Sequence, residues 1–363
     1  MSQAGDRAGL ADCYRAVALT RTRREPAQAV RMIGKAIELA EQVGYPLGQA
    51  LATGDLGEVE RRRARLPAAL AAFDHERELL ERIRFRGGLA INAFRHATIH
   101  FLQARLPKAR AEVEASLANA SQIGSLGVIF CLELRGRIRA EAGKLQAALD
   151  DLDEALQRAV HLEHAERIAN VRRSRAEVLW TVGRLDAAKR DVAAGLEATD
   201  ELAGHGHLAA WGYLPRERLQ LLAARLAIAS GESERALHAI APLTDIFTRL
   251  ETPIEQLEAA VATLAARLEM GADGVHEEAL EQIERAEALG LTLQAFDARL
   301  LAARAHDHHL GARRSLDMAL ERGALVRAAR FAGLVADAAR GAEAKAARET
   351  YDRLIHQLVA EVD

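Results

Sequence analysis

The chain has 363 residues, of which half are hydrophobic and only 4% aromatic, and its formal net charge is −3 at pH 7. This charge and an isoelectric point near 6.5 give no overall attraction to nucleic acid or to an anionic membrane. Cys13 and Cys131 lack the close spacing of a metal or redox motif. We find neither an amino-terminal signal core nor a run of about 18 apolar residues, so we expect a cytoplasmic protein without a membrane partner.

A small residue followed four positions later by a larger apolar residue recurs along the chain. Positions four apart lie on one face of a helix, so each pair predicts a seam that lets a neighbouring helix approach closely. The successive small residues are 40, 40, 39, 40, 48 and 43 residues apart, which is typical of a helical repeat array. The pairs are Ala29 and Ile33, Ala69 and Phe73, Ala109 and Val113, Ala148 and Leu152, Ala188 and Val192, Ala236 and Ile240, and Ala279 and Ile283.

One unit carries further positions of a known repeat. Residues 51–73, LATGDLGEVERRRARLPAALAAF, contain the pair Leu56 and Gly57, the small residue Ala69 and the aromatic Phe73. This segment resembles a tetratricopeptide (TPR) unit, of the longer subclass with about 40 residues. Glu60 stands where that family usually has an aromatic residue, and the closing proline of the family is absent. The resemblance implies an all-α superhelix built from helix pairs.

Prolines indicate where the helices begin, because proline suits the first helical turn. Three of them should begin second helices of a unit and three should begin first helices: Pro26, Pro67 and Pro107, then Pro46, Pro215 and Pro253. Pro242 instead lies inside a second helix and should kink it or end it early. No segment has the period of a strand, and two helices in each period give about sixteen to eighteen helices.

The repeat register divides the chain. We assign residues 1–290 to TPR-like repeats, with an insertion near residues 204–214, GHGHLAAWGYL. This glycine- and aromatic-rich segment should break or bend the superhelix. Loops of this kind often carry function, but we favour an extended helix connection with Trp211 packed on a neighbouring helix. The register weakens after residue 290, so residues 291–363 should be degenerate repeats and a carboxy-terminal cap, continuous with the same solenoid.

Histidines supply the strongest metal-like patterns, and neither indicates a metal site. His306, His308 and His309 are nearly consecutive, and consecutive residues rarely converge on one ion, so we expect a solvated turn. His96 and His100 are spaced four apart, but the glutamate of a metalloprotease helix is absent, so we expect them to serve helix packing. The sequence also has no phosphate-binding glycine loop or nucleophile elbow. We predict a non-catalytic protein with no metal or cofactor.

The resemblance to TPR proteins also implies a binding surface. In that family the first helices line the concave face, and their exposed positions hold an extended peptide or a helix. Guanidinium and amide groups can satisfy a peptide backbone or a carboxylate, while an indole supplies apolar area. Transferring those positions unit by unit gives the candidate partner-binding residues Arg137, Asn170, Arg173, Glu177, Trp180, Arg218 and Arg225.

Two classes of function fit this reading. The leading hypothesis is an interaction scaffold or adaptor that binds a protein or peptide partner in the concave groove, with no role in nucleic-acid binding. The alternative is a regulatory or sensor segment of a larger bacterial signalling or transcription-regulating protein. Such a segment would bind a small ligand or an inhibitory domain, and an adjoining kinase, nucleotide-binding or DNA-binding domain would favour it.

Overall fold

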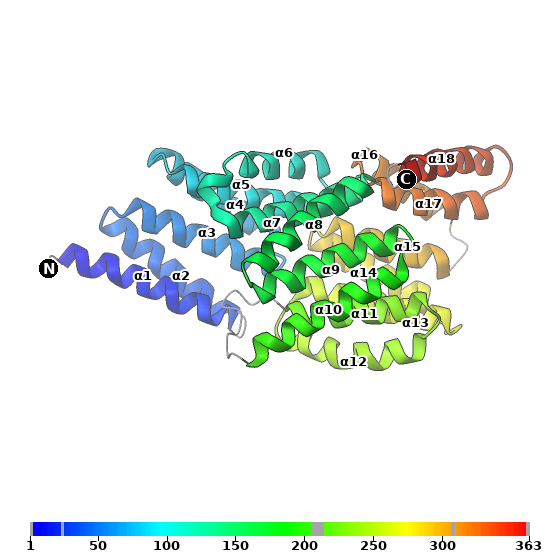
Figure 1. Ribbon diagram of the computed structural model, residues 1–363, viewed down its shortest axis with the longest axis horizontal. Coiled ribbons are helices and arrows are strands. Elements are labelled where there is room, and N and C mark those ends of the chain that lie inside the picture. Colours follow the sequence, from blue (N-terminus) through cyan, green and yellow to red (C-terminus); the bar gives the residue numbers. More distant parts are fainter. Residues whose placement is uncertain (1–2, 23–24, 205–213, 306–308, 361–363) are drawn as a thin grey trace.

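The computed structural model describes residues 3–22, 25–204, 214–305 and 309–360. These ranges form eighteen α-helices and contain no strand, and each helix packs against the next along the chain (Figure 1). The helices are α1 (Gln3–Arg21), α2 (Pro26–Gln42), α3 (Pro46–Arg62), α4 (Leu66–Arg82), α5 (Arg86–Leu102), α6 (Leu106–Leu117), α7 (Ala120–Glu141), α8 (Leu145–His161), α9 (Ala165–Thr181), α10 (Leu185–Gly204), α11 (Pro215–Ala229), α12 (Ser233–Arg249), α13 (Pro253–Glu269), α14 (Val275–Ala288), α15 (Thr292–Ala305), α16 (His309–Glu321), α17 (Leu325–Ala338) and α18 (Gly341–Ala360). The predicted all-α solenoid is confirmed.

The small-residue seams hold the helix pairs together as predicted. All seven repeat alanines, from Ala29 to Ala279, have no exposed surface. The space beside them is equally tight: a Cβ atom on Gly136 would lie 2.9 Å from Cγ of Leu152. In the unit that resembles a TPR, a Cβ atom on Gly57 would lie 2.4 Å from Cε1 of Phe73. Each pair of helices therefore meets at a distance that only a small residue permits.

A recurring three-residue turn sets the angle between successive helices. Between α7 and α8, Gly143 has a φ of +79°. The Lys144 N–H donates to the carbonyl of Arg139 at 2.8 Å, which closes the helix end in a Schellman arrangement. Between α8 and α9 the same place is taken by Glu163, with a φ of +50°. A side chain in this left-handed region costs roughly 1–2 kcal/mol, so the packing of the two helices imposes the turn.

The prolines mark helix starts as predicted, with one exception. The six expected prolines all lie in the first turn of α2, α3, α4, α6, α11 and α13. Pro242 lies inside α12, which continues to Arg249, so of the two predicted outcomes, a kink or an early end, the early end is wrong. The apolar face of α12 remains buried beyond the proline, at Leu243 and Phe247, and this packing holds the last turns in place.

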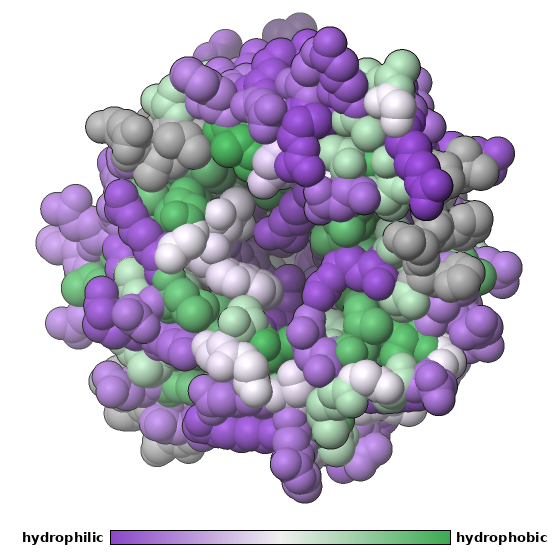
Figure 2. All heavy atoms as spheres, turned by 90° about the vertical axis from the view of Figure 1, so that its right-hand side faces the viewer, coloured by the Kyte–Doolittle hydropathy of each residue, from purple (hydrophilic) through white to green (hydrophobic). Residues whose placement is uncertain are grey.

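The superhelix closes on itself, which encloses the concave groove that the sequence predicted. Helix α17 packs against α7, and Nε of Arg327 lies 3.0 Å from a Glu141 carboxylate oxygen. In the connection between α16 and α17, Nη1 of Arg322 donates to the carbonyl of Gln103 at 2.7 Å. A buried apolar cluster likewise joins Leu66 to Leu291. Viewed from one end, the molecule is a ring with a hollowed centre (Figure 2). The groove is therefore a channel.

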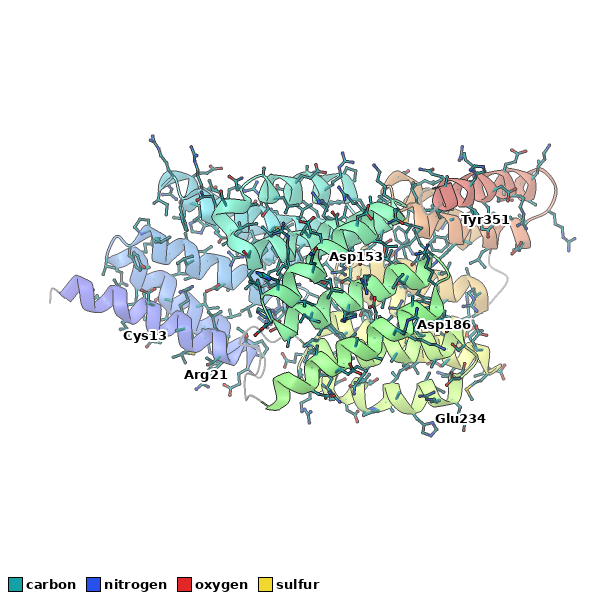
Figure 3. The ribbon with its side chains drawn as sticks, viewed as in Figure 1. Cys13, Arg21, Asp153, Asp186, Glu234 and Tyr351 are labelled. Carbon is teal, nitrogen blue, oxygen red and sulfur yellow. The ribbon has the colours of Figure 1, made fainter. Side chains whose placement is uncertain are left out.

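The last helices continue this packing. Helix α15 packs on α14, α17 on α16, and α18 on α17. At the end of the molecule, Tyr351 of α18 (Figure 3) lies so close to α17 that a Cβ atom on Gly333 would be 3.2 Å from its ring. Residues 205–213, with Trp211, and residues 306–308 lie outside the described residues. Among the described helices, none combines the length and apolar character needed to cross a bilayer.

The seams can be tested with two alanines of one helix. Ala69 of α4 is fully buried, whereas Ala71, two residues later, is exposed. We expect Ala69→Leu to overpack the seam and destabilise the protein by about 1–3 kcal/mol, while Ala71→Leu leaves stability nearly unchanged. Thermal melts followed by circular dichroism would measure both. Equal melting temperatures for the two variants would contradict the seam.

Candidate functional site

Five of the seven predicted partner-binding residues come together on the inner wall. On α9, Nη1 of Arg173 donates to Oε1 of Glu177 at 2.9 Å. From α11, Nη1 of Arg225 lies 3.9 Å from the same oxygen, and its guanidinium is 5.2 Å from the ring centre of Trp180. The fifth, Arg137 of α7, stacks over Phe101 at 4.7 Å. Arg173, Glu177 and Trp180 lie on one face of α9. Helices α7 and α11 both pack against α9, and this brings Arg137 and Arg225 to the same place.

Glu177 is the negative centre of this group. Burial alone would raise the pKa of its carboxyl group, but Arg173, Arg137 and Arg225 outweigh burial and lower that pKa. The carboxylate is therefore ionised at neutral pH. Burial, together with the neighbouring Arg173, lowers the pKa of Arg137. Ionised Glu177 thus fixes the guanidinium of Arg173 by a hydrogen bond and attracts that of Arg225.

Asn170 and Arg218, the other two predicted residues, have partners elsewhere. Asn170 is 4% exposed, and its Nδ2 donates to the backbone carbonyl of Glu166 at 2.9 Å. Arg218 of α11 donates through Nε to Glu255 of α13 at 2.7 Å. Both residues stabilise the wall of the channel in this structure. The sequence placed them correctly on first helices, but it could not show that neighbouring helices supply their polar partners.

A pocket opens beside the Glu177 group. It has a volume of about 340 Å³ and is bounded on one side by Trp180 and Arg225. Its apolar wall comes from α11, α13 and α15 and includes Ile228, Val261 and Leu301. The volume lies within the range of about 300–1,000 Å³ found for ligand pockets, near its lower end. It suits one side chain and its adjoining backbone.

The sequence analysis missed the polar residues that α13, α15 and α17 contribute to this pocket, among them Glu258, Asp297 and Arg330. The transfer of TPR positions ended at α11, because the register weakens towards the carboxyl end. The same first-helix pattern continued through α13, α15 and α17 would have indicated them. They are brought to Trp180 by the closure of the superhelix, which no local pattern records.

Of the positively charged residues that line the pocket, Arg330 is the one whose charge the protein neutralises least. Asp297 and Glu141 are both bonded to Arg327, which lies between them. Among the described residues, Arg330 forms no ion pair of its own. Its side chain is exposed to the channel, yet enough protein surrounds it that burial and the charge of Arg327 lower its pKa. The pocket therefore carries a positive charge that no ion pair neutralises among the described residues.

The pKa of Glu258 is shifted in the opposite direction to that of Glu177. Burial, together with the charges of Glu255 and Glu177, raises the pKa of Glu258. Its nearest polar contact is neutral, since Nε2 of Gln294 donates to its Oε1 at 3.3 Å. The charge of Arg225 opposes the shift without cancelling it. A carboxyl group with a raised pKa in the folded state opposes folding when it ionises.

This shift predicts a pH dependence of stability. Because folding raises the pKa of Glu258 above its ordinary value of 4.5, its contribution is fully present below that pH and is lost as pH rises through the folded-state pKa. We expect Glu258→Gln to raise the melting temperature at pH 7 and to give little or no gain at about pH 4. Glu154→Gln, on the exposed face of α8, is the control. A Glu258→Gln variant less stable than wild type at pH 7 would contradict the shift.

Solved structures share this architecture. One is a Rap protein complexed with Competence and Sporulation Factor, with 14% identity, 94% of this chain and 99% of that chain covered, and a TM-score of 0.61. Another is the Rap conjugation gene regulator of the plasmid pLS20 in complex with the Phr* peptide, with 14% identity, 98% and 96% covered, and a TM-score of 0.56. No protein family and no curated protein matches the sequence. In fold, the chain is a TPR-like helical repeat protein.

Proposed function

We propose that this chain is a non-catalytic regulatory protein that binds a peptide in its closed channel, with one peptide side chain in the pocket beside Trp180. The observation that carries the proposal is the pocket itself. It joins an aromatic wall, an aliphatic wall and Arg330, which has no ion-pair partner among the described residues, around a volume of about 340 Å³. Pockets that combine apolar area with a few convergent polar groups are typical ligand sites.

The group at Glu177 supports recognition of an extended chain. Arg225 is held over Trp180 at 5.2 Å from the ring centre, so the indole already has a fixed orientation. A fixed aromatic ring loses little conformational entropy when a ligand packs on it, and such residues commonly supply most of the binding energy. Arg330 can pair with a carboxylate of the ligand, either an acidic side chain or the carboxyl terminus.

The shape of the channel favours a peptide over a folded partner. The contacts between α17 and α7, and between Arg322 and Gln103, close the side of the superhelix. A ligand then reaches the pocket along the channel axis (Figure 2). An extended chain is slender and suits an enclosed route better than a folded domain does. The peptide-bound Rap regulator of plasmid pLS20 has the same fold, which agrees with this choice.

The proposal is tested with a selected peptide. Panning a random peptide display library against the purified full chain yields a binder, whose affinity is then measured by calorimetry. We expect Trp180→Ala to weaken binding by about 30-fold or more, which corresponds to about 2 kcal/mol. We expect Arg330→Gln to weaken only those peptides that carry a carboxylate. Trp180→Phe should retain part of the affinity, because it keeps an aromatic face.

The matched control is Arg216→Ala, on the exposed side of α11, where Arg216 pairs with Asp200. Arg173 is a poor choice for substitution, because it is 8% exposed and pairs with Glu177, so its loss would disturb the fold. Circular dichroism and melting curves confirm that each variant is folded. If folded Trp180→Ala binds every selected peptide as tightly as wild type, the channel pocket is not the binding site.

A further inference from the structure

A second group of ligand-type side chains lies away from the channel pocket. His96 and His100 are four residues apart on α5, and the adjoining helix α6 brings Glu112 to them. One ligand atom from each residue, an imidazole nitrogen or a carboxylate oxygen, lies within 4.8 Å of the other two. The sequence showed the histidine pair but no third donor. That donor comes from a different helix and is found only in the folded chain.

The histidine nitrogens have unused bonding capacity. The His96 side chain is 5% exposed, and its Nε2 has no hydrogen-bond partner among the described residues. The Nδ1 atom of His100 is also buried without a partner there. A buried nitrogen without a partner is unfavourable, and native proteins rarely retain one. Packing explains part of the arrangement, since His96 lies 5.9 Å from the ring centre of Phe73. It does not explain the two open nitrogens.

The surroundings of both imidazoles lower their pKa values. Burial, and then the charge of Arg77, lowers the pKa of His96. Burial, and then the neighbouring His96, lowers the pKa of His100. A lowered pKa favours the neutral form of imidazole, which is the form that binds metal ions.

We propose that His96, His100 and Glu112 form a binding site for a divalent metal ion of the zinc class, which ties α5 to α6. Two imidazoles and one carboxylate are a common ligand set for zinc, with a fourth position left to water or another donor. A further oxygen is near, because Oδ1 of Asp74 lies 3.6 Å from Nε2 of His96. Tetrahedral ligand atoms lie about 3.3–3.5 Å apart, so the group closes by roughly 1–1.5 Å around the ion.

Arg77 would compete with a metal ion for the carboxylate of Glu112. Its Nη2 donates to both oxygens of Glu112, at 3.0 and 3.2 Å, and its Nε donates to Oδ1 of Asn92 at 2.9 Å. An ion at the site shares Glu112 with Arg77 or releases it, while Asn92 continues to hold the guanidinium. The positive charges of Arg105 and Lys108 also act on His100. These cations oppose the ion and keep its affinity below that of an uncontested site.

The experiment uses the full chain after treatment with a chelator, titrated with Zn²⁺ by calorimetry and with Co²⁺ by visible absorption. We expect one ion per chain and the visible bands of tetrahedral Co²⁺. His100→Gln and Glu112→Gln should each weaken Zn²⁺ binding by at least about tenfold. Even the loss of a residue that only holds a metal ligand in place commonly weakens metal binding by about that factor. The matched control is His161→Gln, at an exposed position at the end of α8, which should bind as wild type does.

Arg77→Gln provides a test that a purely structural role cannot satisfy. Removing the competing cation should tighten Zn²⁺ binding, whereas an ion held anywhere else on the surface would not respond. Melting curves identify any variant that fails to fold, and His100→Gln and Glu112→Gln serve as independent variants. Absence of stoichiometric binding would overturn the proposal. So would binding that persists in both variants but is lost when His306 and His308 are replaced by glutamine.

Discussion

The close approach of paired helices is the constraint on which this structure depends. A side chain larger than alanine at Ala148, or larger than glycine at Gly136, would push the second helix away from the first. Because the same spacing recurs in unit after unit, the small offset between successive pairs accumulates into a superhelix. In this chain the accumulated rotation brings α17 back to α7. The ring, the channel and the pocket inside it all follow from that spacing.

The charges of the inner wall follow from the same closure. Glu177 and Glu258 are both carboxyl groups in the channel, yet the pKa of the first is lowered and that of the second is raised. Their neighbours decide the direction: Glu177 is surrounded by guanidinium groups, whereas Glu258 faces other carboxylates and the neutral Gln294. Most arginines of the wall are neutralised within the protein. Arg330 stands apart from them, because it forms no ion pair among the described residues, and our proposal assigns it to a ligand carboxylate for this reason.

Local sequence patterns predicted the local features of the structure. The seams, the helix starts and the shared face of Arg173, Glu177 and Trp180 all depend on residues a few positions apart, where helical geometry is enough. The closure depends on pairs such as Arg322 and Gln103, which are 219 residues apart. No periodicity records such a pair. The sequence therefore located one wall of the pocket and missed the wall that contains Arg330, for which closure is required.

Closure also changes how this chain must fold and come apart. In an open repeat array each unit contacts only its neighbours, so the array can unravel from either end in small steps. Here the bond from Arg327 to Glu141 joins residues 186 positions apart, and the middle of the chain cannot open without breaking it. Such long-range contacts raise the contact order and slow folding relative to an open helical array. We therefore expect this chain to unfold more cooperatively, and to fold more slowly, than an open repeat array of the same length.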